Sequence, residues 1–303
     1  MDTTFTGRPY AGLGDLKLLR EFVSDAARAR GPQPAYLHPG DLTWGLFANT
    51  VFDPHANIRL WRSTDGRLLG FAWFDEPDEL ELALDPRLPF DAALADEMLA
   101  WGEERLREQS ADGTLAVSAI DDDDERIAFL TGRGLSPIER HNVLFRRDLD
   151  DLPGPSLGTT FEIRAVTGLE EYPRRVALHR EVWDPSRVTL EAYTRLRDAP
   201  GYERDLDIVA VTPGGRFASY CICWLDPVSA TGEFEPVGTG TEFRRRGLAR
   251  AVIFEGLRRM RSRGMRSATV LTASFNDAAL ALYESAGFAV VGHKRFYARP
   301  SAA

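Results

Sequence analysis

The chain has 303 residues, 44% of them hydrophobic and 27% charged, which is enough length and apolar content for two globular domains with sizeable cores. The formal net charge of −9 argues against non-specific nucleic-acid binding, and no apolar run reaches the roughly 18 residues of a membrane helix. The N-terminus lacks a basic segment followed by an apolar one. We therefore expect a cytoplasmic protein without a secretion signal and without nucleic-acid or membrane partners.

The charge is unevenly distributed along the chain. Residues 1–150 contain 16 basic and 28 acidic side chains, a balance of −12, whereas the remaining residues have a balance of +3. An anionic ligand is therefore expected in the second half.

The two halves share a weak internal repeat, which begins with "RPYAGL" at Arg8–Leu13 and "RAVTGL" at Arg164–Leu169. Further matching segments are 66–74 with 215–224, 79–86 with 233–240, and 117–135 with 270–288. Each half is predicted to contain a strand, helices, a run of strands, a helix, a strand, a helix and final strands. The pattern indicates a duplicated α/β unit of mixed α+β type.

The segment "DLDDLPGPSLGTT" at 148–160 is rich in acidic residues, proline and glycine and is predicted to be the linker. We therefore place one domain at 1–150, the linker at 151–160 and a second domain at 161–303.

Several conspicuous residues favour a structural interpretation. Cys221 and Cys223 lie two apart in a predicted strand, so both are expected as buried thiols on one face. The acidic run at 121–125 is expected in a solvated loop that caps the next helix. The five histidines have no metal-ligand spacing, so no metal site is expected.

A glycine-containing loop in the second half connects a strand to a helix. The strand "GEFEPVGT" continues into "GTEFRRRGLAR", and the predicted helix begins at about Gly247 with Ala249, Ile253, Leu257 and Met260 on one face. Such a loop offers free backbone N–H groups and the positive end of the helix dipole, and the arginines add charge-assisted bonds. The pattern favours a pyrophosphate site, and the alternative is a solvated basic turn.

Two motifs in the second half resemble those of the GNAT acetyltransferase superfamily. Arg244-x-x-Gly247-x-Ala249 matches the signature (Gln/Arg)-x-x-Gly-x-(Gly/Ala), and "NDAALALYESAGF" at Asn276–Phe288 is similar to the later motif, in which an asparagine opens a helix with a tyrosine. The resemblance covers roughly residues 160–298 and reaches the first half only through the repeat. The layout is similar to that of tandem GNAT proteins, of which mycothiol synthase is one kind.

The resemblance implies two tandem GNAT-like domains, each a twisted mixed sheet flanked by helices, and acetyl-CoA as co-substrate without a metal. Pro236 cannot donate a ladder hydrogen bond, so we expect a bulge that frees amides near it for pantetheine. Backbone amides of Arg245–Arg250 are expected to hold the pyrophosphate. The full set of implied cofactor-binding residues is Val237, Gly238, Thr239, Arg244, Arg245, Arg246, Gly247, Leu248, Ala249, Arg250 and Asn276.

The family chemistry then assigns three roles. Tyr283 occupies the general-acid position, and the Val237 N–H is the candidate oxyanion donor. Glu233, eleven positions before Arg244, is the candidate base, with Glu235 or a water relay as alternatives. Trp183 and Asp184 fall where the fold places the acceptor wall, but an ordinary buried tryptophan is the expectation for Trp183.

The first half is expected to have lost the cofactor site. Its counterpart of the loop, "PRLPFDAALAD", has no glycine, and Asp123 and Leu130 replace Asn276 and Tyr283. The sequence thus predicts acetyl transfer to a small, cationic amine in the second domain. The alternatives are a non-catalytic module that senses acetyl-CoA and an acyltransferase that uses a longer acyl-CoA.

Overall fold

The computed structural model describes residues 5–48, 50–109, 113–153 and 160–299 and divides the chain into two compact units. The first unit comprises the described residues of Met1–Leu37, Asp53–Leu144 and Val291–Ala303. The second comprises those of His38–Phe52 and Phe145–Val290. None of the described helices has the length and apolar character of a membrane span.

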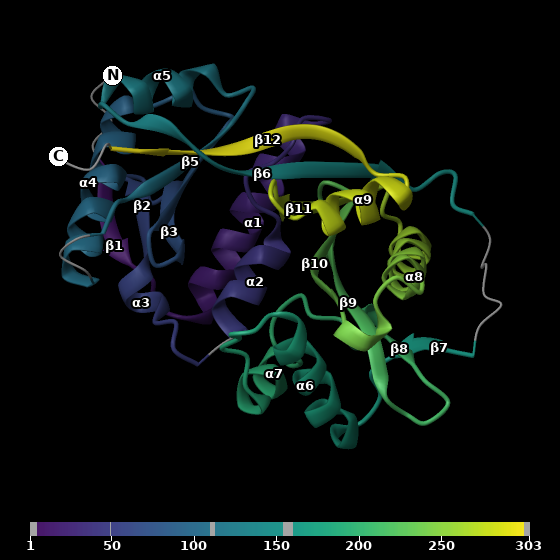
Figure 1. Cartoon of the computed structure of the whole chain (residues 1–303). Coiled ribbons are helices and arrows are strands. Elements are labelled where there is room, and N and C mark those ends of the chain that lie inside the picture. Colours follow the sequence, from purple (N-terminus) through teal and green to yellow (C-terminus); the bar gives the residue numbers. More distant parts are fainter. Residues whose placement is uncertain (1–4, 49, 110–112, 154–159, 300–303) are drawn as a thin grey trace. The chain divides into compact units, whose positions relative to one another are not determined.

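The first unit contains a mixed sheet with strand order β1-β2-β3-β4-β5-β12 (Figure 1). Strands β4 and β5 run parallel, and the other neighbours run antiparallel. Its strands are β1 (Phe5–Pro9), β2 (Ile58–Ser63), β3 (Leu68–Glu76), β4 (Glu79–Leu84), β5 (Ala116–Ile120) and most of β12 (Ala289–Ala298). Its helices are α1 (Leu13–Arg30), α3 (Pro54–Asn57), α4 (Ala92–Gln109) and α5 (Asp124–Gly132). The strand β6 (Ser136–Asp148) begins in this unit and ends in the second.

The second unit repeats this plan with strand order β11-β10-β9-β8-β7, in which β10 and β11 run parallel. Its strands are β7 (Glu162–Ala165), β8 (Asp207–Val211), β9 (Phe217–Asp226), β10 (Thr231–Thr239) and β11 (Ser267–Ala273). Its α-helices are α2 (Pro39–Phe47), α6 (Tyr172–Val182), α7 (Leu190–Leu196), α8 (Leu248–Ser262) and α9 (Asp277–Ser285). Three short 3₁₀ turns lie at Leu169–Glu171, Arg204–Leu206 and Thr241–Phe243.

Equivalent ion pairs in the two units support the predicted duplication. Arg8 donates to Asp15 at 2.6 Å in the first unit, and Arg164 donates to Glu171 at 2.9 Å in the second. Each carboxylate also accepts a backbone N–H from the residue four positions before it. The hydrogen bonds from the arginines are the main cause of the lowered pKa of both carboxyls, which for Glu171 is about 2. The predicted fold class, two mixed α/β units in tandem, is confirmed.

Two segments cross the domain boundaries that we placed at 1–150 and 161–303. Residues His38–Phe52 belong to the second unit, because the Gly40 backbone packs directly on Trp224 and leaves no room for a Cβ atom. The strand β12 from Val291 onward belongs to the first unit, because it pairs with β5 from Lys294 to Ala298. Of the predicted linker 151–160, positions 154–159 lie outside the described residues.

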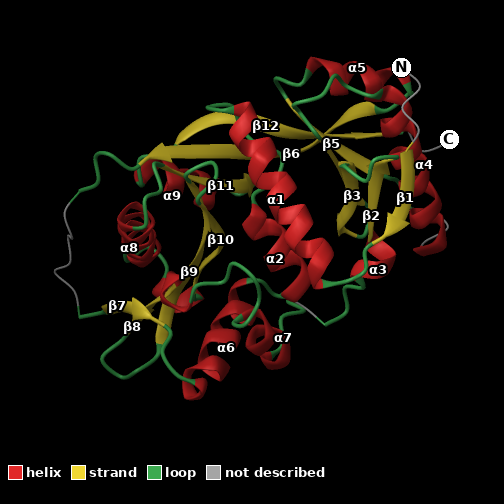
Figure 2. Cartoon of the chain, turned by 180° about the vertical axis from the view of Figure 1, so that it is seen from behind, coloured by secondary structure: helices red, strands yellow, loops and turns green. Residues whose placement is uncertain are grey.

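Helices cover both faces of the second unit's sheet (Figure 2). On β9, the neighbours Tyr220 and Cys221 point to opposite faces: Tyr220 lies against α6, and the Cys221 thiol donates to the Val252 carbonyl of α8 at 3.4 Å. Cys221 and Cys223 are both buried and unbridged, as predicted.

A buried ionic cluster fixes α6 and α7 to the sheet. Asp207 at the start of β8 accepts from Arg175 Nε of α6 at 2.9 Å and from the Tyr193 hydroxyl of α7 at 2.6 Å. The Tyr202 hydroxyl donates to the same carboxylate at 2.8 Å. Since Asp207, Arg175 and Tyr193 are all buried, the cluster is stable only while it is complete.

We predict that Asp207→Ala lowers the free energy of unfolding by about 3–5 kcal/mol, because the Arg175 charge is left buried and unpaired. The matched control is Asp198→Ala, which removes an ion pair with Arg204 whose side chains are 72% and 66% exposed. The control is expected to change stability by less than about 1 kcal/mol. Urea unfolding followed by tryptophan fluorescence measures both, and equal losses would contradict the assignment.

Candidate functional site

The strands β10 and β11 part shortly after they begin to pair. Their parallel ladder joins Thr231–Glu233 to Ser267–Thr269, although β10 continues to Thr239 and β11 to Ala273. The register of β10 against β9 shifts between Phe234 and Val237, which confirms the bulge predicted from Pro236. Beyond Glu233, the edge of β10 that faces β11 therefore presents backbone groups without a ladder partner on that side.

The loop after β10 turns a row of amides outward. The Thr241 N–H is fixed to Glu181 of α6 at 2.7 Å, and both Arg245 and Gly247 have left-handed φ angles, of 63° and 76°. Ala251 donates to the Gly247 carbonyl at 3.0 Å. No side chain caps α8 at Gly247, so the first N–H groups of the helix, from Leu248 to Arg250, have no acceptor within the helix. Uncapped amides at a helix N-terminus form a cradle for an anion.

Exposed arginine side chains surround these amides. Arg244, Arg245, Arg246 and Arg250 are all exposed, and the guanidinium of Arg246 lies 5.7 Å from the ring of Phe243. Leu248 is buried and anchors the first turn of α8, while Ala249 is half-buried beside it. The predicted loop residues thus gather around one positively charged helix end.

The remaining predicted cofactor residues lie on β10 and at α9. Val237, Gly238 and Thr239 pair with Cys221, Tyr220 and Ser219 of β9. A Cβ atom on Gly238 would meet the Tyr220 ring and Val182, so only glycine lets α6 approach the strand this closely.

Asn276 is the N-cap of α9, since its side-chain oxygen accepts the Ala279 N–H at 3.2 Å. The helix start predicted from Asn276 is therefore confirmed. Its part in cofactor binding stays a prediction.

The two candidate base residues have different surroundings. Glu233 is only 8% exposed, and its Oε2 lies 3.1 Å from His38 Nδ1. Glu235 is half-buried, its carbonyl accepts the Trp224 indole N–H at 2.7 Å, and its charge contributes to the raised pKa of Tyr283. The structure thus brings both carboxylates to the strand that is expected to hold the thioester.

His38 was not expected beside Glu233. Its Nδ1 accepts the Gly40 N–H at 3.0 Å in a capping box of α2, and its Nε2 donates to the Thr231 carbonyl at 3.2 Å. Since Nδ1 already accepts one hydrogen bond, the buried Glu233 Oε2 has no hydrogen-bond donor among the described residues. "HPGD" at 38–41 gives the capping box locally, but no sequence pattern links it to Glu233.

Tyr283 projects from α9 into an aromatic group. Its ring lies 5.7 Å from that of Phe145 and 6.0 Å from that of Phe288. Burial, with a smaller effect of the Glu235 charge, raises the pKa of the hydroxyl well above its usual value. The phenol is therefore protonated at neutral pH, as a proton donor must be.

Trp183 is not an ordinary buried tryptophan, so that expectation was wrong. Its indole is 48% exposed because it follows the last turn of α6, and its N–H donates to the Tyr220 hydroxyl at 2.9 Å. The same hydroxyl lies 2.7 Å from His179 Nδ1. Burial, and then the Arg175 charge, lowers the pKa of His179 to about 3, so the ring is neutral and accepts from Tyr220.

Among the described residues, no group of three or more His, Cys, Asp or Glu side chains could hold a metal ion. The acidic run of the first unit has a structural role, since Asp123 caps α5 by accepting the Arg126 N–H at 3.1 Å.

Comparisons with known proteins give a family for part of the chain. Residues 173–288 match the model described as the acetyltransferase (GNAT) family. A search of curated proteins found no significant match.

Three solved structures have a similar fold. A GCN5-related N-acetyltransferase from Sphaerobacter thermophilus has a TM-score of 0.65 at 18% identity, covering 98% of this chain and 97% of that one. A tandem GNAT protein from the clavulanic acid biosynthesis pathway has a TM-score of 0.67 at 16% identity, covering 99% of each chain. A GNAT-family acetyltransferase from Colwellia psychrerythraea has a TM-score of 0.64 at 14% identity, covering 97% of this chain and 100% of that one.

We predict that His179 makes the second unit less stable below pH 6.5. Between pH 6.5 and 3 the unfolded chain binds a proton at His179 that the folded chain does not, so the free energy of unfolding falls as pH falls. From pH 7.5 to 5.5 this contribution is about 1.4 kcal/mol. His179→Asn keeps an acceptor for Tyr220 but does not titrate. Between pH 7.5 and 5.5, its free energy of unfolding in urea should therefore fall by about 1.4 kcal/mol less than that of the parent chain. Identical pH dependence of the two proteins would refute it.

Proposed function

Because the chain carries a domain of the GNAT acetyltransferase family over residues 173–288, we propose that its second unit transfers an acetyl group from acetyl-CoA to a small amine. The observation that carries this proposal is the uncapped N-terminus of α8 at Gly247, which follows the strand whose ladder with β11 ends at Glu233. The first unit is proposed as a degenerate partner that does not bind acetyl-CoA.

The pyrophosphate of acetyl-CoA fits the open amides, with the Arg244, Arg245 and Arg246 side chains beside them. The amides of β10 between Val237 and Thr239 are the proposed partners of pantetheine. Asn276 at the start of α9 is the proposed neighbour of the cofactor on the β11 side. Acetyl-CoA would supply the activated thioester, and the side chains of this unit supply the proton transfers.

The proposed transfer requires three groups of this chain. Glu233, or alternatively Glu235, takes a proton from the acceptor ammonium, whose pKa in a lysine-like amine is about 10.4. The Val237 N–H donates to the carbonyl oxygen while negative charge develops on it. The new C–N bond replaces the C–S bond, and Tyr283 offers its hydroxyl proton to the departing sulfur.

Gly247→Glu tests the cofactor site, and we expect at least about 100-fold weaker acetyl-CoA binding by calorimetry. The new carboxylate would repel the pyrophosphate at the positive helix end. Gly264→Glu is the matched control: it lies at the other end of α8, also has a positive φ, of 86°, and likewise has open space for a Cβ atom. The control should keep the parent affinity. Equal acetyl-CoA affinity in the two variants would support the alternative interpretation, in which the loop is a solvated basic turn.

Tyr283→Phe separates an enzyme from an acetyl-CoA sensor. Phenylalanine keeps the ring contacts with Phe145 and Phe288 and removes only the donor. We expect kcat to fall by about 10²-fold with little change in acetyl-CoA affinity, measured as thiol release in an amine screen. If the parent chain binds acetyl-CoA but acetylates no amine, it is a non-catalytic sensor of acetyl-CoA. If turnover is faster with a longer acyl-CoA, the longer acyl-CoA is the donor.

Glu233→Gln should move the pH–rate profile to higher pH, because only amine that has already lost its proton can then react. Glu235→Gln is the matched variant on the same strand. If Glu235→Gln moves the profile and Glu233→Gln does not, the base is Glu235. Unchanged profiles in both variants would indicate a water relay.

A further inference from the structure

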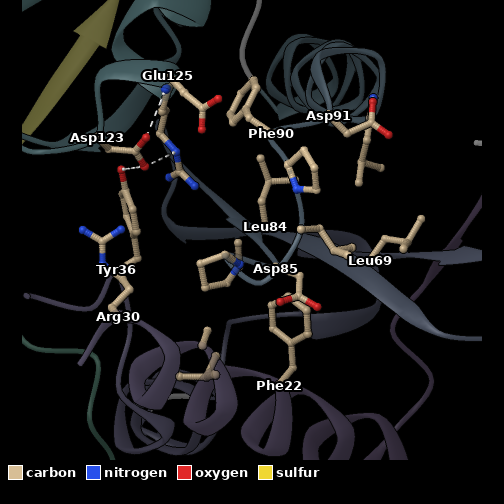
Figure 3. Close-up of a pocket in the computed structure, with 18 of the residues that line it drawn as sticks. Phe22, Arg30, Tyr36, Leu69, Leu84, Asp85, Phe90, Asp91, Asp123 and Glu125 are labelled. Atoms are coloured by element: carbon tan, nitrogen blue, oxygen red, sulfur yellow. Dashed lines mark hydrogen bonds and ion pairs between the residues drawn. The ribbon is translucent and has the colours of Figure 1, made fainter. Parts of the chain in front are cut away.

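The first unit contains an open cavity of about 1030 Å³, shown in Figure 3. It lies at the end of β4, where Ala83 and Leu84 line it, beyond the short ladder that joins Glu79–Leu80 to Ala116–Val117 of β5. Residues of α1, of the loops after β2 and β4, and of the starts of α4 and α5 line it. The cavity therefore occupies the position in the first unit that corresponds to the proposed cofactor site in the second.

In this cavity, the N-terminal amides of α4 are not available to an anion, unlike those of α8 in the second unit. The Asp91 carboxylate accepts the Ala93 and Leu94 N–H groups of α4 at 3.0 and 3.1 Å. Asp85 accepts the Arg87 N–H at 3.0 Å and ion pairs with Arg67 at 2.7 Å. The chain's own carboxylates thus occupy the amides that would hold a phosphate.

The inner wall of the cavity is apolar. Phe22 and Val23 of α1, Leu69 of β3 and Leu94 of α4 line it and are at least nine-tenths buried. Phe90 adds an aromatic ring, 5.4 Å from that of Phe129. A wall of this kind removes water from an apolar ligand body.

The rim of the cavity has an excess of negative charge. The lining contains seven acidic residues, Asp65, Asp85, Asp91, Asp122, Asp123, Asp124 and Glu125, and three arginines, Arg30, Arg67 and Arg126. Arg30 and Arg67 already pair with Asp122 and Asp85 at 2.8 and 2.7 Å.

Two of these acids are available to a ligand. Asp124 and Glu125 are exposed and have no ion-pair partner in the described part of the chain. In the view of Figure 3, the Glu125 carboxylate points toward the Phe90 ring.

A third feature is a buried donor in the lining. Arg126 is 3% exposed, and its Nε has no hydrogen-bond acceptor among the described residues. The nearest carboxylate oxygen, of Asp123, is 3.6 Å away, too far for a hydrogen bond. The rest of the guanidinium is held by Glu81 and the Leu82 carbonyl. The guanidinium carbon lies 3.7 Å from the centroid of the Tyr36 ring, so Arg126 supports the wall of the cavity and is closed to a ligand.

We propose that the cavity of the first unit binds a small organic cation, with an apolar body against the Phe22 and Phe90 wall and an ammonium group at Asp124 and Glu125. An ammonium near Glu125 also lies within reach of the Phe90 ring face. The cleft that holds a nucleotide anion in the second unit would thus hold a cation in the first. The proposal stands independently of acetyl transfer in the second unit.

Dansylcadaverine tests it, because it combines an aromatic body and a primary ammonium. We expect it to bind the full chain with enhanced fluorescence and a Kd below about 1 mM. Dansylamide, without the ammonium, should bind about fivefold more weakly, and the anionic dansylglycine more weakly still. Equal binding of all three probes would overturn the proposal.

Variants locate the probe. Asp124→Asn combined with Glu125→Gln should weaken dansylcadaverine about fivefold and leave dansylamide unchanged. Glu104→Gln, an exposed α4 residue outside the cavity lining, is the matched control. Phe90→Ala should weaken all three probes. If the double variant binds dansylcadaverine like the parent chain, the cation site is elsewhere. Acetyl-CoA affinity measured on the same samples reports on the second unit separately.

Discussion

The structure depends on one constraint, the early separation of two parallel strands at the centre of each unit. A parallel pair that stayed hydrogen-bonded over its full length would seal the sheet and leave no edge between its strands. In the second unit the ladder ends after Glu233, where the bulge at Phe234–Val237 follows. In the first unit it ends after Leu80. The separation of the strands does not depend on the charges of the residues around it. The same backbone arrangement is therefore compatible with the anionic and the cationic ligands proposed for the two units.

The two units differ at the N-terminus of the helix that follows the first strand of each parallel pair, which is α8 after β10 and α4 after β4. At Gly247 the left-handed backbone and the absence of a capping side chain leave the amides open. At Asp91 a side chain caps them from within the chain. One residue type at one position thus decides whether the dipole of the helix is available to solvent or already neutralised.

The sequence predicted those features of the backbone that depend on a single residue and its immediate neighbours. The glycine turn at Gly247, the cap at Asn276 and the bulge at Pro236 each follow from a backbone property of the residue itself, and the structure has all three. The environment of Glu233 could not be predicted, because His38 lies 195 positions earlier in the chain and a capping box does not encode its tertiary partner. Trp183 was misjudged because burial follows from helix packing rather than residue type.

The exchange of segments between the units has a consequence for synthesis on the ribosome. The strand β12, which completes the first unit beside β5, begins at Ala289 and is therefore made long after β5, which ends at Ile120. Until it emerges, β5 presents an unpaired edge during translation of more than half the protein. Residues His38–Phe52 likewise await a partner surface, including Trp224, that is encoded far downstream. Neither unit can reach its final structure in order of synthesis, because each contains a segment separated from the rest of that unit by residues of the other unit.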